Sequence, residues 1–184
     1  MNSNYQMAED EVIIRRMLST GNSEEEAFRI IIRTTQKQLY GIIRRITGDH
    51  MLTDDIMQDV YIKVFENIRS FKWKSSLSTW ICRIGINEAL RVTAREKKHR
   101  HSELTPDVRV GQQDMDYDRW IKHFRNAIAR LPPQQRAVFI VRYYEDMSYK
   151  EMSAIMGLSE GGLKSNYHHA VKKIKNYLDK KGLK

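Results

Sequence analysis

Residues 148–169 read SYKEMSAIMGLSEGGLKSNYHH, and this stretch carries the signals of two short helices joined by a tight turn. Ser148 and Glu151 have the spacing of a capping box that opens the first helix. Gly157 can adopt the positive φ that ends a helix, and Ser159 can cap the next one. Two helices joined in this way predict a helix-turn-helix, the motif that places its second helix in the major groove of DNA.

The second helix of this pair has one apolar and one polar side. The apolar positions, predicted to pack inward, are Leu163, Tyr167, Ala170, Val171, Ile174 and Leu178. On the other side, polar side chains could reach base edges and phosphates. The residues predicted to meet duplex DNA are Ser159, Gly161, Gly162, Lys164, Ser165, His168 and Lys172. The alternative is an ordinary solvated face on a lysine-rich helix, but the turn chemistry and the basic charge together favour groove binding.

Charge is distributed unevenly along the 184 residues. The chain has 32 Lys and Arg against 23 Asp and Glu, a net charge of +9, which points to nucleic acid or an acidic membrane surface as partner. Residues 1–99 have a net charge of +3, residues 100–118 of −3 and residues 119–184 of +9. The middle segment also lacks apolar periodicity. We therefore expect two domains, 1–99 and 119–184, joined by a flexible acidic linker over 100–118.

The rest of the sequence predicts helices without sustained strand alternation, so the expected fold class is all-α, with two small helical domains. Ser23 and Glu26 have capping-box spacing, and Gly48 can end the helix that they open. Thr53 can cap the next helix. The apolar stripes of these two helices are Phe28, Ile31, Ile32, Leu39, Ile42, Ile43 and Ile46, and Leu52, Ile56, Val60, Val64 and Ile68. We expect a loop over 71–79, a long helix over about 80–98, and a helix break at 132–133.

The segment 71–80, FKWKSSLSTW, mixes aromatic, lysine and hydroxyl side chains. This composition suits single-stranded nucleic acid, because bases stack on aromatic rings and phosphates are neutralised by lysine. Arg83, Asn87 and Arg91 follow on one face of the adjoining helix, where an Asn amide suits the edge of an extruded base. The alternative reading is that Phe71 and Trp80 are core and the arginines are only solvated. The residues predicted to meet a single strand are Lys72, Trp73, Lys74, Ser75, Ser76, Ser78, Thr79, Trp80, Arg83, Asn87 and Arg91.

The sequence contains no pattern typical of catalysis, a metal site or a cofactor site. Its only cysteine, Cys82, lies in a helical stripe, and the histidine pairs 99/101 and 168/169 have the wrong spacing for ligands on one helix face. No apolar run reaches about 18 residues, and acidic residues 9–11 precede any apolar run. We therefore expect a cytoplasmic protein that is not an enzyme, holds no cofactor or metal and is not embedded in a membrane.

Two other functions fit part of the sequence. A stand-alone regulator could bind duplex DNA through the helix-turn-helix and dimerise through its first domain, which predicts symmetric half-sites. The aromatic and basic loop 71–80 counts against it, because a duplex reader has no need of such a loop. An RNA-binding adaptor could use that loop, but the second domain would then be unexplained.

The motifs in both domains, taken together, resemble the extracytoplasmic-function (ECF) sigma factors of bacterial RNA polymerase, within the sigma-70 family. The first domain carries Asp55-Ile-Met-Gln58-Asp59-Val-Tyr61, Phe65, Thr79-Trp80 and Arg83-Ile-Gly-Ile-Asn87. The second carries Leu131-Pro132, Arg136, Tyr149-Lys-Glu151-Met152, Met156-Gly157-Leu-Ser159, Leu163-Lys164-Ser165 and His169. These motifs occur in the family's order and spacing over residues of about 25 to 178, which makes the combination specific.

The resemblance implies partners and roles that spacing alone does not. Core RNA polymerase would bind Asp55, Gln58, Asp59 and Lys63, a set that otherwise resembles a solvated helix face. The loop 71–79 with Asn87 would capture a flipped base of the melted minus-ten element of promoter DNA. The C-terminal helix would read the minus-thirty-five element as duplex, and the acidic linker would run toward the RNA exit path. Members of the family are commonly inhibited by an anti-sigma factor, which is a further expected partner.

Three residues depart from the family pattern. Arg91 stands where many members have an acidic residue, which points to a phosphate rather than a base as its contact. Gly162 replaces a common Thr, and Asn166 replaces a common Arg. Gly161 and Gly162 should also weaken the start of the recognition helix, by up to about 1 kcal/mol for each Gly relative to Ala.

Overall fold

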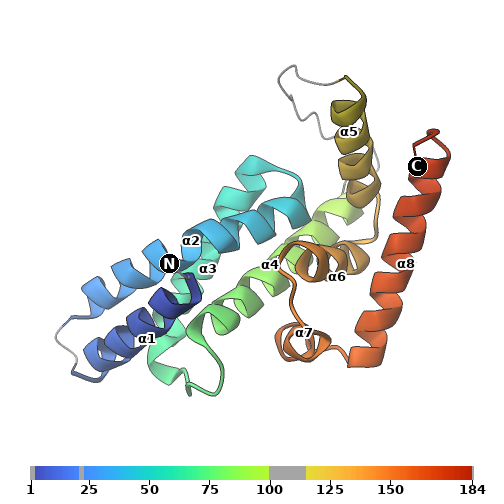
Figure 1. The fold of residues 1–184 in the computed structure, drawn as a ribbon. Coiled ribbons are helices and arrows are strands. Elements are labelled where there is room, and N and C mark those ends of the chain that lie inside the picture. The colour runs from blue at the N-terminus through green and yellow to red at the C-terminus, as the bar shows by residue number, and fades with distance from the viewer. Residues whose placement is uncertain (1–2, 21–22, 100–114, 184) are drawn as a thin grey trace.

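The computed structural model describes residues 3–20, 23–99 and 115–183, and its regular elements in these ranges are all helices (Figure 1), which confirms the all-α class. The helices are α1 (Ser3–Thr20), α2 (Glu24–Thr47), α3 (His50–Asn67), α4 (Leu77–His99), α5 (Met115–Ala129), α6 (Pro133–Tyr144), α7 (Tyr149–Met156) and α8 (Glu160–Asp179). A single 3-10 turn, η1 (Ile68–Ser70), follows α3.

The helices form two groups, α1–α4 and α5–α8, which lie at opposite ends of the molecule in Figure 1. In the first group α2 packs against α1, α3 and α4, and in the second α8 packs against α5, α6 and α7. Gly85 allows α4 to approach α2 closely, because a Cβ at this position would lie 2.6 Å from Cδ1 of Leu39. The predicted apolar stripes of α2 and α3 form the core of the first group, with Ile31, Ile42 and Val60 fully buried.

The turn chemistry around the helix-turn-helix is as predicted. Ser148 and Glu151 form both hydrogen bonds of a capping box at the start of α7. Gly157 ends α7 with φ of +68°, and the hydroxyl of Ser159 accepts from the backbone N–H of Gly162 at the start of α8. Gly48 likewise ends α2 in the left-handed conformation.

Two predicted helix caps are wrong. Ser23 stands at the N-cap of α2, but its side chain makes no capping hydrogen bond. Asp49 rather than Thr53 caps α3, and its carboxylate accepts from the N–H of Leu52 at 2.9 Å. Thr53 lies one turn inside the helix, fully buried, where its hydroxyl bonds to that of Thr47 at 2.8 Å.

Some boundaries also differ from the sequence-based expectation. Helix α1 was not predicted, and α4 begins at Leu77, so the expected loop 71–79 is shorter by its last three residues. Helix α5 begins at Met115, which makes the last four residues of the expected linker helical, while residues 100–114 lie outside the described ranges. Val171 was expected in the core of the second domain but is 40% exposed.

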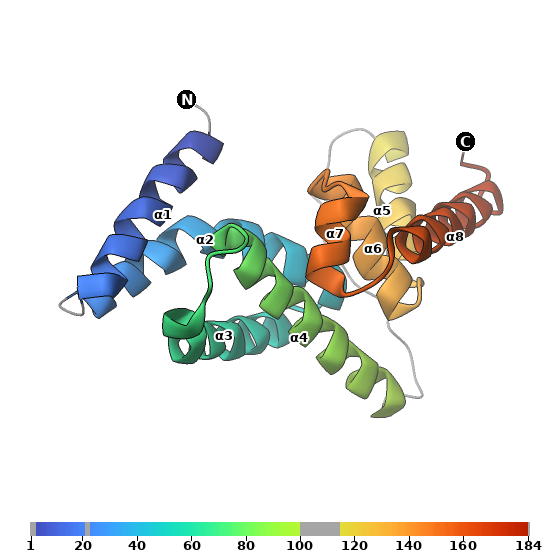
Figure 2. The ribbon, with the colours of Figure 1, turned by 90° about the horizontal axis from the view of Figure 1, so that it is seen from below.

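The two helix groups pack against each other through α2, α4, α6 and α7 (Figure 2). Glu145, at the end of α6, accepts from the side-chain amide of Gln38 at 3.1 Å and pairs with Arg45 at 3.4 Å. The Arg45 guanidinium also lies 4.5 Å from the ring centre of Tyr144. Arg136 of α6 also donates across this contact, to the backbone carbonyl of Ile46 on α2 at 3.0 Å. Polar contacts therefore hold the two groups together.

Candidate nucleic-acid interface

The first candidate surface is the exposed face of α8, the second helix of the helix-turn-helix. Helix α8 forms one edge of the molecule in Figure 1. The predicted duplex-contacting side chains of Lys164, Ser165, His168 and Lys172 are exposed, whereas the opposite side buries Leu163, Ala170 and Ile174. The first helix of the motif braces this face, since the Lys164 ammonium lies 5.6 Å from the ring centre of Tyr149. The geometry therefore presents the predicted set on one accessible side.

The first turn of α8 contains the other predicted duplex contacts, Ser159, Gly161 and Gly162. Ser159 and Gly161 are exposed, and a Cβ on Gly161 would meet no atom within 4 Å. Gly162 is partly buried and is more constrained, because a Cβ there would lie 3.2 Å from the Ser159 hydroxyl that caps the helix. Of the two glycines, only Gly162 is thus constrained by a neighbouring atom.

The second candidate surface is the loop over residues 71–76, between η1 and α4. Phe71 stacks on Trp80 with ring centres 4.8 Å apart and contacts the Trp73 ring at 5.0 Å. These three rings are partly buried and pack against the core, so Trp80 contributes to both the core and the loop surface. Trp73 has φ of +54°, a conformation rare for a bulky side chain, and the Arg15 guanidinium of α1 lies 5.6 Å from its ring centre. The lysines 72 and 74 are exposed beside this cluster.

Hydroxyl groups predicted to meet DNA already have partners at the start of α4. The Ser76 hydroxyl accepts from the N–H of Thr79 at 3.1 Å, and the Ser76 and Thr79 hydroxyls are 2.7 Å apart. The Ser78 hydroxyl lies 3.5 Å from the amide oxygen of Gln38, and Ser75 is exposed. Glu11 of α1 accepts from the N–H of Leu77, where the positive end of the helix dipole favours a carboxylate. This side of the loop is thus held in place by the chain itself.

The exposed face of α4 continues from this loop and contains Arg83, Asn87 and Arg91, all three exposed as predicted. Arg83 forms no ion pair with any described residue, whereas Arg91 is held by Glu88, three residues earlier on the same helix. The two arginines on this face therefore differ, because only Arg91 is paired with a carboxylate.

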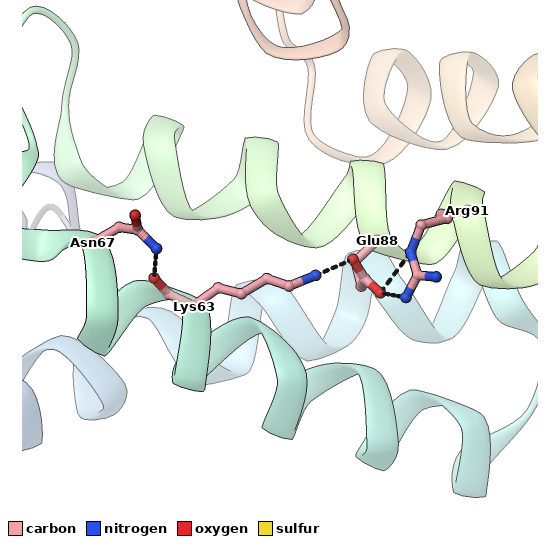
Figure 3. Close-up of polar contacts among 4 residues, drawn as sticks. All are labelled: Lys63, Asn67, Glu88 and Arg91. Carbon is pink, nitrogen blue, oxygen red and sulfur yellow. Dashed lines mark hydrogen bonds and ion pairs between the residues drawn. The ribbon is translucent and has the colours of Figure 1, made fainter.

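Glu88 is the one charged residue that is buried in the described part of the chain. Its carboxylate accepts from the Lys63 ammonium of α3 and, through the other oxygen, from Nε of Arg91 at 3.0 Å and from Nη2 of the same residue (Figure 3). The hydrogen bonds from Arg91 hold the pKa of Glu88 below its usual value and outweigh burial, which raises it; Lys63 lowers it further. Sequence reasoning missed Glu88. Its position three residues before Arg91 on a predicted helix could have indicated an ion pair between the two.

The predicted docking residues lie along one exposed side of α3. Asp55, Gln58 and Asp59 are exposed, and the Lys63 side chain is 42% exposed beside Glu88. Sequence reasoning assigned no apolar residue to this surface, but Ile62 and Phe65 of the same helix are 57% and 53% exposed. Large apolar side chains exposed beside charges are typical of a protein contact, so this side of α3 has the composition of a protein interface.

The chain's only cysteine, Cys82, is buried within α4. Burial raises the pKa of the Cys82 thiol to about 12, so the thiolate that would act as nucleophile is scarce at neutral pH. Within the described ranges, no three His, Cys, Asp or Glu side chains gather as metal ligands. No described helix is long and apolar enough to cross a membrane.

Known proteins match both helix groups in order. The family model for sigma-70 region 2 matches residues 31–99, and that for sigma-70 region 4 matches residues 122–174. The chain is 28% identical over 166 residues to the ECF RNA polymerase sigma factor SigX of Bacillus subtilis (strain 168), covering 84% of this chain and 85% of that protein. It is 22% identical over 181 residues to SigW of the same strain, covering 91% of this chain and 97% of that protein.

Two solved structures share the fold. CnrH, in complex with the cytosolic domain of CnrY, matches with a TM-score of 0.67 and 20% identity over 92% of this chain and 97% of CnrH. The sigma factor RpoE of Bartonella quintana, in complex with the anti-sigma factor NepR, matches with a TM-score of 0.64 and 23% identity over 83% of this chain and 96% of RpoE.

A helical region 2 followed by a helix-turn-helix region 4 defines the class of two-domain transcription initiation factors. The chain belongs to the sigma-70 family and, within it, to the extracytoplasmic-function sigma factors. As a sigma factor it directs transcription by RNA polymerase, and proteins of this family are not themselves catalysts. The alternative of a stand-alone regulator is not favoured, because both helix groups match sigma-70 regions in the family's order.

Proposed function

We propose that the loop 71–76 and the exposed face of α4 bind the melted minus-ten strand of the promoter. The contacting residues are Lys72, Trp73, Lys74, Ser75, Ser76, Ser78, Thr79, Trp80, Arg83 and Asn87. The exposed lysines beside a three-ring aromatic cluster support this assignment, since bases can stack there while their phosphates are neutralised. The amide of Asn87 can donate and accept at the edge of a base.

Strand capture at this surface would couple promoter recognition to melting. Extruding a base from duplex DNA costs a few kcal/mol, and stacking on an aromatic ring returns about 1–3 kcal/mol for each base. The two terms nearly balance, so additional contacts to a particular base decide whether the open strand is held. Recognition of the minus-ten sequence and melting would then be one event.

The exposed face of α8 is proposed to read the minus-thirty-five element as duplex. Lys164, Ser165 and His168 would reach base edges in the major groove, while Lys172 would contact a phosphate. Ser159, Gly161 and Gly162 lie in the first turn, where the backbone can approach DNA closely. The observation that supports this assignment is that α8 exposes these polar side chains on one side and buries Leu163 on the other.

The exposed side of α3 is proposed to dock on core RNA polymerase. Asp55, Gln58, Asp59 and Lys63 would supply polar contacts, and Ile62 would add apolar area between them. The two solved structures described above each contain a second protein, which in the Bartonella quintana complex is the anti-sigma factor NepR. We include an anti-sigma factor among the partners proposed for this chain.

Transcription from a pool of genomic promoter fragments tests the assignment of α8. Replacing Lys164 and His168 with Ala should change or weaken promoter selection, while binding of the chain to core polymerase should stay at the wild-type level. A matched control is Lys175→Ala on the same helix two turns later, which should keep the wild-type promoter profile. An unchanged profile for the double variant would mean that α8 does not read the minus-thirty-five element.

A further inference from the structure

We propose that Arg91 belongs to the polymerase-docking side of α3 rather than to the strand-binding face of α4, and that Glu88 is the residue that positions it there. This inference deepens the proposed function and rests on it, since it extends the docking surface of Asp55, Gln58, Asp59 and Lys63 across the boundary with α4. Helical periodicity alone places Arg91 on the same face of α4 as Arg83 and Asn87, which is why the sequence predicted a DNA contact for it.

The first support is the way Glu88 joins the two helices. One carboxylate oxygen binds the ammonium of Lys63 on α3, and the other binds two nitrogens of the Arg91 guanidinium on α4 (Figure 3). The Glu88 side chain is only 6% exposed, whereas those of Lys63 and Arg91 are 42% and 50% exposed. A buried anion thus holds two cations at the surface, side by side.

The second support is a second acidic side chain near Arg91. Asp59 of α3 lies close enough to add to the stabilisation of the charged guanidinium, after the larger effect of Glu88. Asp59, Lys63, Glu88 and Arg91 therefore form one cluster along the boundary of α3 and α4, which we name the α3–α4 charge cluster. Two of its members already belong to the proposed docking surface.

This environment disfavours a DNA phosphate as the partner of Arg91. A phosphate that approached the guanidinium would meet the negative charges of Glu88 and Asp59, and like charges in contact repel. Arg83, two turns earlier on α4, has no ion-pair partner in the described part of the chain and is free to bind a phosphate. The two arginines thus suit different partners.

The cluster fits a protein surface that carries both signs of charge. Its exposed members are the acidic Asp59 and the basic Lys63 and Arg91, and Ile62, 57% exposed, follows Asp59 by one helical turn on α3. Protein interfaces combine an apolar centre with charged groups at the rim, and arginine is enriched in them. The proposed occupant is the same surface of core RNA polymerase that receives Asp55 and Asp59.

Competition binding to core RNA polymerase of the source bacterium, with the full-length chain, tests the assignment. Arg91→Gln should raise the dissociation constant about fivefold, as expected for an exposed charge pair at an interface. Arg83→Gln, the matched control on the same helix, should bind core as the wild type does. The second measurement is the binding of holoenzyme to a pool of duplexes that carry an unpaired minus-ten bubble. Here the effects of the two variants should be exchanged: Arg83→Gln should weaken DNA binding and Arg91→Gln should not.

The positioning role of Glu88 is tested by combining variants. Glu88→Gln should also weaken core binding, and the double variant with Arg91→Gln should lose less than the product of the two single effects, because Glu88 acts partly through Arg91. Multiplicative effects would mean that Glu88 only supports the fold and would overturn this role. Arg91→Lys keeps the charge but loses the two-point contact, and it should weaken core binding even where the Gln variant fails to fold.

The failure of this inference can be distinguished from failure of the docking proposal. If Asp55→Lys loses core binding while Arg91→Gln keeps it and loses bubble binding, Arg91 belongs to the strand surface and the inference is wrong. If Asp55→Lys itself binds core normally, the docking surface is misplaced and the inference falls with it.

Discussion

At the scale of single residues, Glu88 combines burial with charge. Burying a carboxylate is costly unless it is paired, and the two cations that pair it come from different helices. Asn67 follows Lys63 by one turn and donates to its backbone carbonyl at 2.8 Å, which continues the polar contacts along α3 (Figure 3). Removing Glu88 would leave two neighbouring cations without their shared anion.

The lowered pKa of Glu88 makes a prediction about stability and pH. Because the folded-state pKa lies below the unfolded value, the ionised carboxylate stabilises the fold fully above the usual pKa of Glu, about 4.3, and loses this effect as the pH falls through the folded value. Glu88→Gln cannot titrate. The difference in unfolding free energy between wild type and Glu88→Gln should therefore be constant near neutral pH and shrink below about pH 4.

Urea unfolding of the two proteins over a range of pH measures this difference. Glu66→Gln, a change of the same chemistry at an exposed position of α3, is the matched control for removing a carboxylate from this helix. A difference for Glu88→Gln that grows as the pH falls would contradict the ion-pair geometry.

At the scale of elements, the start of α8 has two consecutive glycines in a helix that we propose to enter DNA. Gly161 is exposed and has room for a Cβ, whereas Gly162 faces the capping hydroxyl of Ser159. Glycine inside a helix costs backbone entropy that alanine does not. The recognition helix therefore begins with a segment of low intrinsic helix stability.

Gly161→Ala should raise the unfolding free energy by up to about 1 kcal/mol, because it removes this entropy cost without a clash. Thermal or urea unfolding measures the gain. Gly162→Ala, the neighbouring control, should gain less, since its Cβ would press on the cap at 3.2 Å. A loss of stability in Gly161→Ala would mean that the first turn of α8 is not the helix described above.

The elements show which features a sequence can predict. The capping box of Ser148 and Glu151 and the turn at Gly157 were predictable, because each depends on residues a few positions apart. Helix α1 was missed because its apolar residues do not form one buried stripe: Ile14 is buried, while Val12 and Ile13 are exposed. The cap of α3 was misassigned because Asp49 and Thr53 are both good capping residues four positions apart.

The candidate surfaces, too, have features that the sequence predicts and features that it does not. The exposed polar face of α8 follows from helical periodicity alone, and so does the exposure of Arg83 and Asn87 on α4. Contacts between distant residues were out of reach, such as Lys63 with Glu88, 25 residues apart, and Gln38 with Glu145, 107 residues apart. These contacts decide which exposed side chains are already engaged.

At the scale of the whole molecule, the two helix groups are held together by polar contacts around Glu145. The Glu145 side chain is 13% exposed and contacts both Gln38 and Arg45 of α2. Helix α7 of the helix-turn-helix also packs against α4, which carries part of the proposed strand-binding face. Interfaces between domains of one chain are commonly mobile, so a single charge at such an interface can shift the balance between packed and separated states.

Glu145→Lys should place a positive charge against Arg45 and separate the helix groups, which small-angle X-ray scattering would detect as a larger radius of gyration at low salt. The control is Asp146→Lys, the same reversal of charge at the next residue, whose side chain is 95% exposed and pairs with Arg142 of α6. Equal scattering from the two variants would mean that Glu145 does not hold the groups together.

The other proposals depend on the exposed side of α3, which we propose brings this sigma factor to RNA polymerase. The decisive measurement is the affinity of the purified chain for core RNA polymerase, compared between wild type and the double variant Asp55→Lys with Asp59→Lys. A control variant, Glu25→Lys, makes the same reversal of charge at an exposed residue of a different helix, α2. We predict tight one-to-one binding by wild type and Glu25→Lys and loss of binding by the folded double variant. Binding of the double variant at the wild-type level would contradict the docking proposal.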